Sequence, residues 1–162
     1  MPGNRTIQPM RIRRDWSLAI LLAVSVALAS YLPVWLANDL APDDRAFSGF
    51  LLNPIDGHTY LAKMHQGLEG SWGFQLDYAA EPGQPVFLYP FYLLLGHLAA
   101  GLGIELVDFF HAVRVTMLAL MFIASYAFFN RFLESRPARW IAYGLTLIGS
   151  GLGWLGLIFG VE

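Results

Sequence analysis

The chain has 162 residues, of which 56% are hydrophobic and 14% charged, and its formal net charge is −2. Soluble domains are typically about 45–50% apolar and about 25% charged, so this composition is typical of a membrane protein. It excludes a disordered chain, a coiled coil and a nucleic-acid-binding module, and we therefore expect no nucleic acid among the partners. The sequence has no cysteine, which excludes disulfide scaffolds, zinc ribbons and thiol catalysis.

The first apolar segment, residues 16–36, contains no charged residue and is long enough to cross a membrane. As a helix it reaches about 31 Å, against a hydrocarbon core of about 30 Å. The preceding residues 1–15 hold four arginines and one aspartate, which predicts a cytoplasmic N-terminus. A cleavable signal peptide is the alternative, because Ala27-Leu28-Ala29 resembles a cleavage site. The apolar run is longer than a signal-peptide core, and this favours an uncleaved helix.

Residues 37–108 are predicted to form a large extracytoplasmic loop. They hold nine of the 12 acidic residues and only two of the ten basic ones, Arg45 and Lys63. This scarcity of basic residues is typical of a segment outside the cytoplasm.

Within this loop, residues 86–102 are apolar but contain Pro90 and Gly96. They either cross the membrane or form a juxtamembrane helix along its outer surface, with Tyr89 and Tyr92 at the interface. If they crossed, the three arginines that follow the next span would lie outside, against the positive-inside tendency. We therefore favour the juxtamembrane helix.

Two further spans are predicted at residues 109–133 and 140–161, joined by a cytoplasmic turn at residues 134–139 in which Pro137 favours a sharp reversal. In the last span, glycines spaced four or three residues apart allow close helix packing: Gly149, Gly153, Gly156 and Gly160. The predicted fold is an all-α membrane protein with three transmembrane helices and a large extracytoplasmic first loop carrying short juxtamembrane helices.

Asp56 is the most informative polar residue of the loop. It lies just before a short helix predicted at residues 59–68, where it or Asn53 can cap backbone N–H groups. The alternative is a carboxylate that acts at the outer membrane face as a general base or metal ligand. The crowding of other polar side chains into the next nine residues favours this alternative: His58, Tyr60, Lys63 and His65.

Arg114 lies about five residues inside the predicted second span. Ionisable residues in such positions usually face the protein interior or a polar cavity. It either pairs with a loop acid, reaches the interface, or binds an anionic head group, because guanidinium binds phosphate bidentately. Asp108, His111 and Arg114 follow one another at intervals of three residues, which predicts a polar ladder along one side of the helix.

The order of these features resembles the polytopic glycosyltransferases of the C superfamily (GT-C), which use polyprenyl-phosphate sugars. Residues 56–72, an acid followed by a Tyr-containing helix ending in Gly and Trp, are similar to the first-loop segment of that superfamily. Glu81-Pro82 and Leu88-Tyr89-Pro90-Phe91-Tyr92 resemble the segment that closes this loop. Val113-Arg114-Val115 resembles the arginine at the start of the next span.

This resemblance implies that Asp56 is the catalytic base that deprotonates the acceptor, or a ligand for a divalent cation such as Mg²⁺ or Mn²⁺. The base would activate an acceptor hydroxyl or amide for attack at the anomeric carbon, with polyprenyl phosphate as leaving group. The resemblance implies membrane lipid, a polyprenyl-phosphate-linked sugar and an acceptor of unknown identity as partners, in the plasma membrane of a prokaryote. The substrate-binding residues that it implies are His58, Tyr60, Lys63, Glu81, His111 and Arg114.

Members of the superfamily have more spans and a second acidic motif after the third one, where this sequence stops at Glu162. The chain corresponds to the N-terminal third of such an enzyme, and we expect it to be inactive alone. The alternative function is that of a small non-enzymatic membrane subunit that acts in assembly or partner binding. The short length and the glycine-lined last span favour that alternative.

Overall fold

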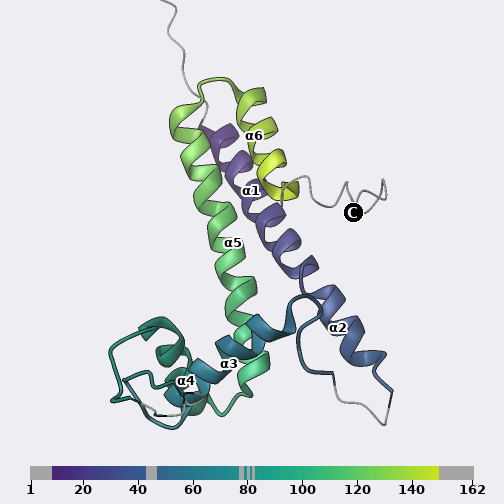
Figure 1. Cartoon of the computed structure of the whole chain (residues 1–162). Helices are drawn as coiled ribbons and strands as arrows, with labels where there is room; N and C mark the ends of the chain where they lie inside the picture. Colours follow the sequence, from purple (N-terminus) through teal and green to yellow (C-terminus); the bar gives the residue numbers. More distant parts are fainter. Residues whose placement is uncertain (1–8, 43–46, 77–78, 80, 82, 150–162) are drawn as a thin grey trace, which may run out of the picture. The chain divides into compact units, whose positions relative to one another are not determined.

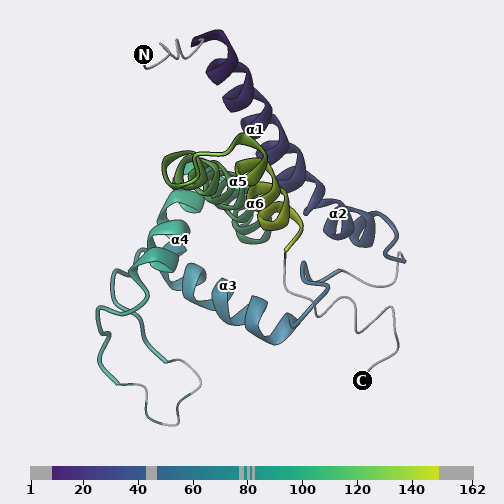
Figure 2. The ribbon, with the colours of Figure 1, turned by 90° about the horizontal axis from the view of Figure 1, so that it is seen from above.

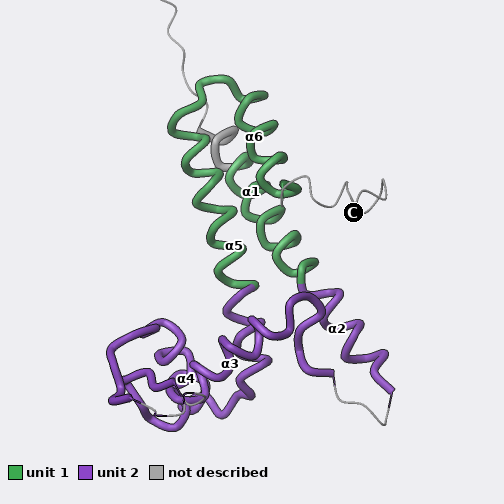
Figure 3. The backbone as a smooth tube through the Cα atoms, viewed as in Figure 1, with its two compact units in different colours: residues 1–30, 115–162 green, residues 31–114 purple. Residues whose placement is uncertain are grey.

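The computed structural model describes residues 9–42, 47–76, 79, 81 and 83–149, and this part of the chain is all-helical apart from loops (Figure 1). Its one β-bridge there pairs Phe74 with Val86. The chain divides into two compact units, Met1–Ser30 with Val115–Glu162, and Tyr31–Arg114 (Figure 3). The predicted all-α fold class is confirmed for the described residues. In chain order the helices are α1 (Pro9–Ala29), α2 (Leu32–Asp39), α3 (Pro54–Leu68), α4 (Pro90–Leu102), α5 (Leu106–Phe132) and α6 (Arg136–Ile148).

Two helical stretches, Arg14–Asp39 and Leu106–Phe132, are long and apolar enough to cross a membrane. They cover the first predicted span and all of the second except Leu133. Of the predicted third span at 140–161, α6 covers residues 140–148, whereas 150–161 and three of its four glycines lie outside the described residues.

The first of these stretches is interrupted, because α1 ends at Ala29 and α2 begins at Leu32. Pro33 explains the interruption: it has no N–H to donate to the carbonyl of Ala29, and its ring crowds that carbonyl. At the end of α1, the hydroxyl of Ser30 donates to the carbonyl of Ala27 at 2.6 Å. The continuous helix expected over 16–36 is therefore two helices.

In the first unit, α1, α6 and the larger part of α5 lie side by side (Figure 2). Small side chains one turn apart on α1, Ala19, Ala23 and Ala27, are each at most 1% exposed. Such residues let helix backbones approach closely. Across from them, the hydroxyl of the buried Tyr143 donates to the carbonyl of Ala19 at 2.8 Å. The alanine face of α1 is thus the close-packing face of this unit, in addition to the glycine face predicted for the last span.

An ion pair joins the first half of α1 to the start of α6. Arg136 donates from Nε and Nη2 to the two carboxylate oxygens of Asp15, at 2.9 and 2.6 Å, and Asp15 is buried. The helix begins at Arg136 because Ser135 caps it by accepting from the N–H of Ala138, and Pro137 fits its first turn. The turn is consequently shorter than the predicted 134–139 and lies between Phe132 and Arg136.

In the second unit, α3 and α4 cross with their backbones in contact. A Cβ atom on Gly67 would lie 2.0 Å from the carbonyl oxygen of Leu93, and one on Gly96 would lie 1.9 Å from that of Met64. Neither position has room for a side chain. Met64, buried beside this crossing, packs with Phe109 and other apolar residues of α4 and α5.

Helix α3 begins at Pro54 instead of the predicted residue 59. Proline fits the first turn of a helix, where its missing N–H is no loss. Asn53 precedes it with a positive φ of 48°, and its side chain makes no capping bond to the helix backbone. Asp56 therefore lies inside the first turn of α3, and the expected cap by Asn53 is not present.

We expect Gly67→Ala and Gly96→Ala to destabilise the purified chain by about 2 kcal/mol or more, because each methyl group would push against backbone atoms. Gly101→Ala, also on α4 but with no atom within 4 Å of the added Cβ, is the matched control. It should leave stability unchanged or raise it by up to about 1 kcal/mol. Thermal unfolding in detergent measures all three, and a Gly96→Ala chain as stable as Gly101→Ala would contradict the crossing.

Candidate functional site

The helix crossing places the ammonium group of Lys63 among three tyrosine rings. Its Nζ atom lies 4.1 Å from the ring centre of Tyr89, 5.2 Å from that of Tyr60 and 5.6 Å from that of Tyr92. We call Tyr60, Tyr89 and Tyr92 the tyrosine cage. Lys63 is 9% exposed and is the only lysine of the sequence. Cation–π attraction of this kind contributes from about 0.5 to about 2 kcal/mol, and most where water is excluded.

The backbone of Tyr89 is held in an unusual conformation beside Lys63. Its φ of 55° and ψ of 41° lie in the left-handed region, which costs of order 1–3 kcal/mol for a residue with a large side chain. Its carbonyl accepts the N–H groups of Tyr92 and Leu93, at 3.0 and 3.3 Å, as α4 begins. The conformation thus starts the helix while the Tyr89 ring covers Lys63.

Stacking extends the cage to α5. The Tyr60 ring lies parallel to that of Tyr92 at 5.0 Å and to that of Phe110 at 6.1 Å. Burial raises the pKa of Tyr92 above its usual value, and the neighbouring Tyr60 adds to this. Tyr92 is therefore a neutral phenol at pH 7 and supplies no negative charge to Lys63. Among the described residues, no carboxylate forms an ion pair with Lys63.

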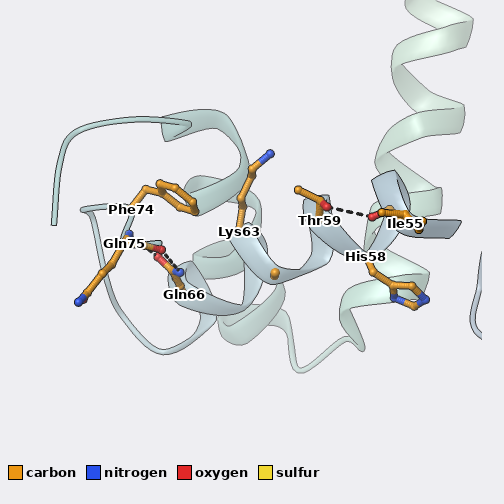
Figure 4. A pocket seen from close by; sticks show the side chains of 8 residues that line it. Ile55, His58, Thr59, Lys63, Gln66, Phe74 and Gln75 are labelled. Carbon is orange, nitrogen blue, oxygen red and sulfur yellow. Dashed lines mark hydrogen bonds between the residues drawn. The ribbon is translucent and has the colours of Figure 1, made fainter. Parts of the chain in front are cut away.

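A cavity of about 450 Å³ lies along α3 next to Lys63 (Figure 4). We call it the α3 cavity. It is lined by Ile55, His58, Thr59, Ala62, Lys63, Gln66, Phe74 and Gln75.

Hydrogen bonds fix the wall of the α3 cavity that comes from the loop. The side-chain amide of Gln66 donates to the carbonyl of Gln75 at 2.7 Å, and its oxygen accepts the N–H of Gln75 at 2.9 Å. Phe74 pairs with Val86 through two backbone hydrogen bonds of 2.8 and 3.0 Å. The buried Phe74 ring in turn meets Tyr89 edge to face at 5.0 Å. The cavity wall and the tyrosine cage are thus one connected arrangement.

Asp56 lies seven residues before Lys63 on α3, a rise of about 10 Å along the helix. Its carboxylate is exposed, accepts a hydrogen bond from the side-chain amide of Asn53, and is not part of the α3 cavity lining. The described residues contain no group of three or more His, Cys, Asp or Glu that could hold a metal ion. The geometry around Asp56 thus offers a solvated carboxylate and no surrounding ligand set.

His111 and Arg114, two members of the predicted polar ladder, are in contact. His111 is 4% exposed; its Nε2 lies 2.8 Å from the carbonyl of Gly49, and its Nδ1 accepts from Nε of Arg114 at 3.3 Å. Both bonds form together only if the imidazole is neutral with its proton on Nε2. Asp108 is exposed and lines a second cavity of about 160 Å³ together with His111. His111 and Arg114 therefore do not contribute to the lining of the α3 cavity.

The predicted site residues are brought together in part. His58 and Lys63 line the α3 cavity, and Tyr60 contributes to the cage, whereas Glu81 is exposed and belongs to neither. Sequence reasoning missed the cage contribution of Tyr89 and Tyr92, which it assigned to the membrane interface. The aromatic residues on either side of Pro90 were the feature of the sequence that could have indicated the cage. Their contact with Lys63, however, depends on the crossing of α3 and α4.

Comparison with known proteins adds no further assignment. No protein-family model, curated protein or solved structure matches the chain.

Proposed function

We propose that the chain is part of an integral membrane glycosyltransferase that moves a sugar from a polyprenyl-phosphate donor to an acceptor on the extracytoplasmic face. The observation that carries this proposal is the exposed carboxylate of Asp56 in the first turn of α3, the helix that also bears Lys63 and the α3 cavity. A base that water can reach and a cation at a cavity are the two charges that displacement of a phosphate leaving group requires.

The membrane location is supported by the low burial of the two long helices. In the most apolar 18-residue windows of Arg14–Asp39 and Leu106–Phe132, only 17% and 11% of the residues are buried. A core helix of a soluble protein is mostly buried, so these apolar surfaces are suited to contact with lipid. We assign the chain to the plasma membrane of a prokaryote, with its N-terminus in the cytoplasm.

The Asp15–Arg136 pair supports the proposed topology. It joins the N-terminal half of α1 to the start of α6, so the arginines that flank these two helices lie on the same side of the membrane. This requires an even number of crossings between them, which α1 and α5 supply. Helix α4, with 13 residues, reaches about 20 Å and is too short to add a crossing. It fits the juxtamembrane role, and the loop that contains Asp56 then lies outside.

We assign Asp56 the role of general base. Its carboxylate takes the proton of the acceptor hydroxyl or amide as the acceptor oxygen or nitrogen attacks the anomeric carbon, and the bond from that carbon to the phosphate oxygen breaks. We prefer this role to that of metal ligand, since Asp56 belongs to no group of three or more His, Cys, Asp or Glu among the described residues that could hold a metal ion. The hydrogen bond from Asn53 orients the carboxylate.

Asp56→Ala in the complete enzyme should lower sugar transfer by about 10²–10⁴-fold, the usual contribution of a general base. Membrane-bound protein level should stay unchanged, because the side chain is exposed. Glu69→Ala removes another exposed carboxylate just after α3 and should leave transfer intact. The assay follows transfer from a radiolabelled polyprenyl-phosphate sugar to membrane acceptors. Unchanged transfer by Asp56→Ala would contradict the proposal and favour the alternative, a non-enzymatic assembly subunit.

Cysteine labelling tests the orientation on a clean background, because the sequence has no cysteine. Glu134→Cys, in the turn between α5 and α6, should react with a membrane-impermeant maleimide only after permeabilisation. Glu69→Cys should react in intact cells. Labelling of Glu134→Cys in intact cells would reverse the proposed topology.

A further inference from the structure

We propose that the α3 cavity binds an anionic lipid, with Lys63 receiving the negatively charged head and the apolar walls holding the adjoining hydrocarbon. The inference deepens the proposed function and rests on it only in naming polyprenyl phosphate as one source of such a lipid. It assigns the anion to Lys63, whereas the resemblance to GT-C enzymes assigned it to Arg114.

Lys63 carries a buried positive charge that no carboxylate of the described chain neutralises. Burying an ammonium group without a negative partner costs several kcal/mol, and cation–π contacts with the cage offset only part of that cost. No carboxylate of the described chain pairs with Lys63, although the loop is rich in acids. A ligand anion in the adjacent cavity would complete the missing pair. Arg114, in contrast, already donates from Nε to His111.

The rest of the cavity lining indicates what kind of ligand fits. Ile55, Ala62 and Phe74 present apolar surface, and two of the polar lining residues, Thr59 and Gln66, use their side chains on hydrogen bonds within the chain. Gln66 uses its amide nitrogen and oxygen on Gln75, and the Thr59 hydroxyl donates to the carbonyl of Ile55 at 2.9 Å.

The direction of the side chains supports this reading. In Figure 4, Lys63 and Thr59 extend to one side of α3, whereas His58 projects to the other. A ligand that fits has one anionic group for Lys63 and an apolar body for Ile55, Ala62 and Phe74, which describes a lipid better than a free sugar phosphate.

The exposed face of α4 indicates where the ligand comes from. Helix α4, packed against α3, exposes apolar side chains one turn apart along its length: Phe91, Leu94, Leu98 and Leu102. Such a stripe is typical of a helix that lies in the membrane interface. Lipid head groups would then lie at the level of α4 and of α3, which packs against it. The lipids that α3 would meet there share one chemistry, a phosphate attached to hydrocarbon. The two sources are a polyprenyl phosphate and a membrane phospholipid.

Native mass spectrometry of the full chain, released from zwitterionic detergent, tests the assignment with four probes. Polyprenyl monophosphate and phosphatidic acid represent the two sources. The two controls are polyprenol, which lacks the phosphate, and inorganic phosphate, which lacks the hydrocarbon. We expect saturable one-to-one binding of at least one phosphate lipid. If polyprenyl monophosphate binds more tightly, the site serves the sugar donor; if both bind equally, it is a general anionic-lipid site. Equally tight binding of polyprenol or of inorganic phosphate would overturn the assignment.

Lys63→Met should weaken binding of the phosphate lipid by about tenfold or more, the loss expected for a charge-assisted contact. Lys63→Arg should retain most of the binding, and Arg131→Gln removes an exposed cation elsewhere as the matched control. Unchanged affinity in a folded Lys63→Met chain would overturn the assignment.

A second measurement needs no variant. Bound phosphate lipid should slow acylation of Lys63, the only lysine, relative to the N-terminal amine. Equal slowing of both amines would contradict the site. Because these assays do not require sugar transfer, lipid binding that persists alongside an active Asp56→Ala enzyme would refute the proposed function and leave the binding site in place.

Discussion

The contact between the backbones of α3 and α4 is the constraint on which the second unit depends. Gly67 and Gly96 bring the two helices so close that even a methyl group would meet a carbonyl oxygen. At this separation the rings of Tyr89 and Tyr92, from the start of α4, reach Lys63 in the middle of α3. A wider crossing would leave the ammonium group in water and open the tyrosine cage. The packing of two glycines therefore determines the electrostatic surroundings of the only lysine.

Helix α3 carries two charged side chains, and their surroundings differ. Asp56 lies exposed in the first turn of α3, whereas Lys63 is buried two turns later between aromatic rings. A carboxylate in water can exchange protons freely, and a cation away from water interacts more strongly with an anion because the local dielectric constant is low. This division suits a reaction that takes a proton at one place and stabilises a departing phosphate at another. It is the physical basis of the function that we propose.

The sequence allowed prediction of what depends on neighbouring residues. Apolar length predicted the two long helices, and the three-residue spacing of His111 and Arg114 predicted their contact. The interruption before Pro33 and the start of α3 at Pro54 were missed because the apolar and helical patterns run across them. The tyrosine cage could not be predicted from the sequence for another reason. Lys63 and Tyr89 are 26 residues apart, and their contact depends on a helix crossing at two glycines, which have no side chains that could form a recognisable pattern.

The helix crossing encloses Lys63 in aromatic rings, and because the sequence has a single lysine this enclosure can be measured directly. Reductive methylation with ¹³C-formaldehyde labels only Lys63 and the N-terminal amine, and it keeps the positive charge. In the folded chain in detergent, ring currents of the tyrosine cage should move the Lys63 methyl resonance upfield from that of free dimethyl-lysine. The resonance should return to the free position on unfolding. A methyl resonance at the free position in the folded chain would contradict the account.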